Sequence, residues 1–123
     1  MKFFLAQINP VVGDLEGNAE KILNIASKAC SISADFVLTP ELSIWGYPAN
    51  DLLLKKNLIR YQYQILDQLA LDIKKKYGDL SITVGMAEII NDSFFPNLYN
   101  SIALLEGGEW KIIARKIILP TYE

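Results

Sequence analysis

The spacing of apolar residues alternates along the chain between strand-like and helix-like, and this pattern constrains the fold more than any other feature. Residues 2–9 are apolar on both alternating faces, which predicts a strand buried from both sides. A short apolar run at residues 35–38 predicts a second strand, and residues 52–77 predict a long helix. Between the two strands, from about residue 17, a helix is predicted by the spacing of Ala19, Ile22, Leu23, Ala26, Ala29 and Cys30.

The last third of the chain predicts three strands. Residues 81–89 alternate small with large side chains, which suits a strand that another segment approaches closely on one face. Strands at residues 99–105 and 110–118 are joined by Gly107 and Gly108, which favour a tight hairpin because glycine adopts positive φ angles. The order β-α-β-α-β-β-β predicts one α/β (α+β layered) domain, a mixed sheet with helices on one face.

Composition narrows the chemistry that these residues can perform. The 123 residues are 51% apolar and carry a net charge of -2, which is globular composition without the basic footprint of a nucleic-acid-binding protein. Histidine is absent and Cys30 is the single cysteine. The chain therefore cannot by itself build a histidine metal site, a serine–histidine or cysteine–histidine pair, or a disulfide. Catalysis must use carboxylate, amine or thiol groups.

The single cysteine also bears on location. We expect Cys30 to be a small buried hydrophobe in the apolar stripe of its helix rather than a reactive thiol. The apolar start is too short for a signal peptide, and no run approaches membrane-spanning length. These features predict a soluble, cytoplasmic chain with no membrane partner.

A candidate site follows the second predicted strand. Pro40 ends the apolar run and Glu41 comes next, at the strand end where ligands and catalytic groups collect in α/β folds. Trp45 and Tyr47 lie in the following loop, and Asp51 offers an N-cap to the next helix. We expect the aromatic residues to cover Glu41. The alternatives are a solvated loop acid and aromatic residues that only pack the loop onto the core.

The last predicted strand supplies a partner for this acid. Period two puts Lys116 on the face that carries Trp110 and Arg115 on the face that carries Lys111. A lysine in an apolar face needs a carboxylate nearby, because an unpaired buried ammonium costs several kcal/mol. Glu41 is the natural partner. The alternative is that Lys116 is a charge that protects an edge strand from aggregation. This explanation suits Arg115 better than Lys116.

Together these segments resemble the nitrilase, or carbon-nitrogen hydrolase, superfamily, which uses a glutamate–lysine–cysteine triad on an α-β-β-α sandwich. The segments that match, in family order, are Pro40-Glu41-Leu42 with Gly46-Tyr47, the Gly85 strand, Tyr99-Asn100-Ser101, Gly107-Gly108, and Arg115-Lys116 with Leu119. The likeness is greatest to the glutaminase domains of glutamine-dependent NAD synthetases. It rests on residues 6–14, Pro40-Glu41-Leu42-Ser43, Gly46-Tyr47-Pro48, Asp51-Leu52-Leu53, and Lys116 with Leu119-Pro120-Thr121-Tyr122.

The resemblance implies a role for each matching residue. Glu41 would be the general base and Lys116 the cation that stabilises the oxyanion, while a cysteine elsewhere attacks the glutamine side-chain amide. Tyr47 and Tyr122 would line the glutamine pocket. The resemblance further implies a homo-oligomer without a cofactor or metal in this domain. ATP, Mg and deamido-NAD would belong to a synthetase domain that uses the released ammonia.

The chain departs from the family at the nucleophile. The family's cysteine follows the Lys116 motif at some distance, and Cys30 does not match it; Glu123 likewise falls too early for a second family glutamate. We therefore expect residues 1–123 to be the N-terminal portion of a glutaminase domain, inactive alone. Trp45 and Ala49-Asn50 also depart from the family and bear on which amide is the substrate. Two alternatives stay open. One is part of a stand-alone amidase acting on another small amide, and the other is a non-catalytic module that associates with a partner chain.

Overall fold

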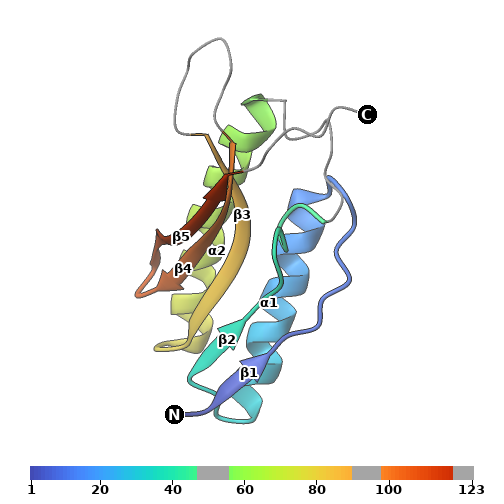
Figure 1. Cartoon of the computed structure of the whole chain (residues 1–123). Coiled ribbons are helices and arrows are strands. Elements are labelled where there is room, and N and C mark those ends of the chain that lie inside the picture. The colour runs from blue at the N-terminus through green and yellow to red at the C-terminus, as the bar shows by residue number, and fades with distance from the viewer. Residues whose placement is uncertain (47–55, 90–97, 118–123) are drawn as a thin grey trace.

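The computed structural model describes residues 1–46, 56–89 and 98–117. The strands are β1 (Phe3–Leu5), β2 (Phe36–Leu38), β3 (Ser81–Ile89), β4 (Leu98–Glu106) and β5 (Glu109–Ile117), and the helices are α1 (Leu15–Ser31) and α2 (Lys56–Tyr77). Their order is the one that the sequence predicts. Figure 1 shows both helices against the same face of the sheet, with α1 behind β1 and β2 and α2 behind β3 to β5.

The five strands form one mixed sheet in the order β1-β2-β3-β4-β5. β1, β2 and β3 are parallel, and β3, β4 and β5 are antiparallel. The two helical crossovers account for the parallel half, and the Gly107-Gly108 turn, with φ angles of 64° and 83°, closes the antiparallel hairpin. The predicted mixed sheet with helices on one face is confirmed.

The strand register separates two faces of the sheet. One row consists of Phe4, Val37, Ile82 and Leu105, and this helix-covered face packs against α1 and α2. The row beside it consists of Leu5, Leu38, Thr83 and Leu104, and we call its side of the sheet the open face. The large apolar side chains Phe3, Leu5, Leu38 and Ile102 are exposed there.

The core lies between the helices and the sheet. α1 begins at the N-cap Asp14, whose carboxylate accepts a hydrogen bond from the Gly17 amide. Apolar residues at helical spacing then bury one stripe of each helix. The fully buried members include Ile22, Ala26, Ile59, Leu66 and, from the sheet, Val37 and Met86. Their burial is the main source of stability in a fold of this kind.

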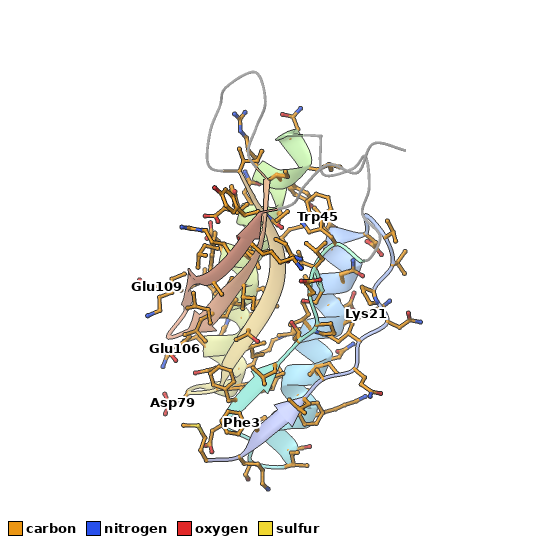
Figure 2. The ribbon with its side chains drawn as sticks, viewed as in Figure 1. Phe3, Lys21, Trp45, Asp79, Glu106 and Glu109 are labelled. Carbon is orange, nitrogen blue, oxygen red and sulfur yellow. The ribbon has the colours of Figure 1, made fainter. Side chains whose placement is uncertain are left out.

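Two expectations about burial are wrong. Cys30 is exposed rather than part of the core, because it lies at the flank of a stripe whose last buried member is Ala29. The first strand is covered on one side only, so that Phe3 (labelled in Figure 2) and Leu5 are exposed. Apolar residues on both faces of a strand predict a packed layer on each side of it. The described residues form such a layer on one side.

Candidate active site

The loop that carries Glu41 is fastened to β3 by backbone hydrogen bonds. β3 continues past the end of β2, which leaves amide groups on that edge without a neighbouring strand. The loop supplies the missing partners: Ser43 Oγ accepts from the Gly85 amide at 3.0 Å, and the Ile44 amide donates to the Gly85 carbonyl at 3.1 Å. The loop therefore takes the place of a strand at this edge, and Glu41 lies two residues before Ser43, the first of the two anchoring residues.

Gly85 allows this close approach. A Cβ atom at this position would lie 2.3 Å from the Leu42 nitrogen and 2.5 Å from the Pro40 oxygen, both backbone atoms. Backbone atoms cannot give way as a flexible side chain can. The prediction that one face of residues 81–89 is closely approached is confirmed, and the approaching segment is the Glu41 loop.

A buried glutamine of α2 continues the same edge. Gln62 Oε1 accepts a hydrogen bond from the Ala87 amide, and Gln62 Nε2 donates to the Ala87 carbonyl, so one side-chain amide imitates a neighbouring strand. The indole Nε1 of Trp45 donates to the same Oε1 atom. Trp45 is fully buried, as is Gln62. The expectation that Trp45 covers Glu41 is therefore wrong, because its indole packs in the core where Gln62 satisfies its one donor.

A buried asparagine of α1 holds the loop from the other side. Asn18 Nδ2 donates to the carbonyl oxygens of Val11 and Ile44, and Asn18 Oδ1 accepts from the Val11 amide. Sequence reasoning missed both Asn18 and Gln62. Each interrupts the apolar stripe of an amphipathic helix, and a polar residue on such a stripe is the signal that could have identified them.

β5 contains a β-bulge that changes which face its side chains occupy. Ala103 of β4 is paired with Ile112, but the preceding residue of β4, Ile102, is paired with Ala114. Ile113 is therefore the extra residue. Side chains alternate between the two faces of a regular strand, and an extra residue reverses the alternation beyond it.

The bulge places two neighbouring cations on the faces opposite to those predicted. Arg115 is paired with Ser101 and lies on the helix-covered face that also carries Trp110. Lys116 is paired with Asn100 and lies on the open face. The prediction that Lys116 shares a face with Trp110 is wrong, because period two holds only where the strand is regular.

The open face is where Lys116 meets Glu41. The distance from Lys116 Nζ to Glu41 Oε1 is 3.4 Å, and the two residues are 75 positions apart. The predicted pairing is confirmed. The predicted dry surroundings are not found among the described residues, since the Lys116 and Glu41 side chains are 73% and 56% exposed. The pair is thus an open, singly bonded acid and amine at the carboxyl end of the parallel strands.

Arg115 forms a different kind of pair on the other face. Its Nε and Nη2 atoms each lie 2.9 Å from one oxygen of the Glu88 carboxylate, and Ser101 Oγ donates to Glu88 Oε1 at 3.0 Å. The guanidinium also lies 5.9 Å from the centre of the Tyr99 ring. Hydrogen bonds to Glu88, followed by its negative charge, raise the pKa of Arg115. This is a two-pronged ion pair in which both oxygens of the Glu88 carboxylate accept hydrogen bonds.

Three site predictions fall on residues outside the described parts of the chain. They are the substrate contacts Tyr47 and Tyr122 and the helix N-cap Asp51. Within residues 1–46, 56–89 and 98–117, no group of three or more acidic or cysteine side chains could hold a metal ion. Among the helices of those same parts, none is long and apolar enough to cross a membrane.

Fold, acid and amine together define a class of protein. The carbon-nitrogen hydrolase family matches residues 5–123, and the chain belongs to that family. The mixed sheet also resembles an amidase from Nesterenkonia sp., with a TM-score of 0.72 over 100% of this chain and 44% of the amidase at 19% identity, which shows the shared fold.

Several relatives of this chain have a named activity. The chain is 38% identical over 119 residues to the glutamine-dependent NAD(+) synthetase of Synechocystis sp. and 34% identical over 122 residues to that of Thermotoga maritima. A solved synthetase from Acinetobacter baumannii superposes with a TM-score of 0.76 at 31% identity, over 98% of this chain and 22% of that one. The matches cover 97% and 99% of this chain but 21% and 20% of the two synthetases. The 123 residues thus correspond to about a fifth of such an enzyme.

Proposed function

We propose that these residues contribute the acid and the amine of a glutamine-hydrolysing site in a glutamine-dependent NAD synthetase. The observation that carries the proposal is the meeting of Glu41 and Lys116 on the open face, since two segments 75 residues apart converge at the strand ends. Membership of the carbon-nitrogen hydrolase family and the identity to named synthetases over nearly the whole chain support it.

The chemistry assigns one task to each side chain. The Glu41 carboxylate takes the proton from a cysteine thiol, and the thiolate sulfur attacks the side-chain carbonyl carbon of glutamine. The negative charge that develops on the carbonyl oxygen is stabilised by the Lys116 ammonium. The carbon–nitrogen bond then breaks, ammonia leaves with the proton that Glu41 returns, and water hydrolyses the thioester to glutamate. Tyr47 and Tyr122 are proposed to line the glutamine pocket.

The geometry of the pair suits these tasks. Lys116 has three N–H donors, and its contact with Glu41 at 3.4 Å occupies one of them, which leaves donors for an oxyanion. Cys30 cannot be the nucleophile, because it lies near the end of α1, away from the strand ends that carry Glu41. The proposal therefore takes the thiol from a part of the protein outside these 123 residues. It also assigns ATP, Mg and deamido-NAD to a synthetase domain outside them, and expects a homo-oligomer.

The test is glutamine hydrolysis by the full-length protein that contains these residues, followed as glutamate and ammonia release. We expect Glu41→Gln to lower kcat by about 10³-fold. The control Glu109→Gln, at the exposed hairpin, should leave it unchanged. Hydrolysis of another small amide but not of glutamine would favour a stand-alone amidase. The 123-residue chain alone should release no ammonia, and turnover by it that Glu41→Gln abolishes would contradict the external nucleophile.

A further inference from the structure

We propose that Glu88 and Arg115 form a positioning pair that holds β5 in its bulged register and so keeps Lys116 opposite Glu41. Neither residue reaches the reacting atoms in this account. They act on the helix-covered face, where they fix which face of the sheet each side chain at the end of β5 occupies. The kinetic part of the test rests on the proposed function, and the structural part does not.

We consider two registers in which the end of β5 can pair with β4. In the observed register Ile113 is bulged, Arg115 is paired with Ser101, and Lys116 is paired with Asn100. Without the bulge, each residue beyond Ile112 would move by one position along β4. Arg115 would then lie opposite Asn100 on the open face, and Lys116 would lie on the helix-covered face, away from Glu41. A one-residue slip exchanges the faces of every side chain that it affects.

The Glu88 carboxylate selects between these registers. Its side chain is 14% exposed and accepts hydrogen bonds from both prongs of Arg115 and from Ser101. In the slipped register Arg115 would leave, and a largely buried carboxylate without its cation is costly. The slipped register would also bring Lys116 to the helix-covered face, where a single ammonium cannot reproduce the fork of a guanidinium. Glu88 therefore favours the register in which Arg115 faces it and Lys116 faces Glu41.

Most surface ion pairs contribute little, and two features distinguish this one. The contact is two-pronged, with both N···O distances at 2.9 Å, and Ser101 anchors the same carboxylate to the strand that lies between β3 and β5. The pair also ties three adjacent strands together at the position next to Lys116, where a change in register would displace the amine.

A chemical cross-link reads the position of Lys116 without any assay of activity. Carbodiimide joins a lysine amine to a carboxylate that it contacts, and mass spectrometry of the full-length protein measures the Glu41–Lys116 product. The Lys74–Asp79 contact at 3.7 Å serves as the internal standard. We expect Arg115→Met to lower the ratio of the two products at least about fivefold, whereas Lys111→Met, on the same strand before the bulge, leaves it unchanged. An unchanged ratio in Arg115→Met, or no Glu41–Lys116 product in the unmodified protein, overturns the inference.

The kinetic test separates positioning from general stabilisation. In the full-length protein, Arg115→Met should lower kcat for glutamine by about 10- to 100-fold with little change in KM, because molecules in the slipped register have no amine opposite Glu41 and a misplaced catalytic group costs about this much. In a Lys116→Ala background the same substitution should have no further effect on kcat. A further loss in that background would show that Arg115 acts by another route, and would overturn the inference.

A charge exchange covers the case in which Arg115→Met fails to fold. Glu88→Arg combined with Arg115→Glu restores an ion pair across the same strands, and we expect it to recover the Glu41–Lys116 cross-link. A folded double variant without the cross-link overturns the inference. If the unmodified protein forms the cross-link and loses it in Arg115→Met but does not hydrolyse glutamine, the proposed function fails and the positioning role stands.

Discussion

The two faces of the sheet use the same kinds of charged residues in opposite ways. On the helix-covered face, Glu88 is largely buried and accepts three hydrogen bonds, two from Arg115 and one from Ser101. On the open face, Glu41 and Lys116 share one contact of 3.4 Å and are mostly exposed. A carboxylate with its partners complete stabilises a structure, whereas an acid and an amine with spare capacity can serve a ligand. The difference separates the residues that hold the sheet from those that can react.

Uncharged polar side chains also hold the structure together on the helix-covered side. Gln62 and Asn18 are fully buried, and each makes three hydrogen bonds to the segments around the Glu41 loop. Variants of Gln62 and Asn18 should therefore mainly change stability. Variants of the open-face pair should mainly change activity.

The largest expected effect is on activity. In the full-length protein, Lys116→Met should lower kcat for glutamine by about 10³-fold, equivalent to about 4 kcal/mol in the activation barrier, because it removes the cation that we propose to stabilise the oxyanion. The melting temperature should not change, since the Lys116 side chain is 73% exposed. Lys111→Met is the matched control. A fall in Tm with kcat retained would erase the proposed difference between the faces.

The second effect falls on the helix-covered side. Gln62→Leu removes the partners of three buried polar groups, the Trp45 indole N–H and the Ala87 amide and carbonyl. We expect a loss of about 3 kcal/mol in the free energy of unfolding, since each unsatisfied group costs about 1–3 kcal/mol and some relax. Urea denaturation measures it, with the exposed Gln64→Leu on the same helix as control. Equal stabilities of the two variants would contradict the role of Gln62.

Gly85 lies in the sheet and contacts the loop that carries Glu41, so its substitution should affect both stability and activity. Gly85→Ala adds a methyl group where the backbone of Leu42 and Pro40 already lies within 2.5 Å. The loop must move, which we expect to lower the free energy of unfolding by about 2 kcal/mol and to displace Glu41. Denaturation and glutamine turnover should fall together. Loss of one without the other would show that loop position and sheet packing are independent.

The smallest effect is a pH dependence on the helix-covered side. Burial raises the pKa of Tyr63 above its ordinary value of 10.0; the charge of Glu88 adds to this, and the hydrogen bond from the Ile89 amide opposes it. Between pH 10 and the raised pKa the unfolded chain has released the proton and the native chain has not, so stability falls as pH rises through this range. Tyr63→Phe should flatten that part of the curve. An unchanged alkaline slope would contradict it.

Particular residues show how far the sequence alone predicts this molecule. The Gly107-Gly108 hairpin, the small face around Gly85 and the pairing of Glu41 with Lys116 were all predicted, because each depends on local residue type or on the position of strand ends. The face of Lys116 was not, since the bulge at Ile113 depends on the register with β4 and not on the pattern within β5. Trp45 was misplaced because its partner, Gln62, lies on a distant helix.

The most direct test of the central claim, that Glu41 and Lys116 act as one unit, is a double-mutant cycle on glutamine hydrolysis by the full-length protein. We expect Glu41→Gln combined with Lys116→Met to be about as slow as either single variant, since a catalytic unit that has lost one member gains little from the other. A double variant whose loss equals the product of the two single losses would show that the acid and the amine act independently.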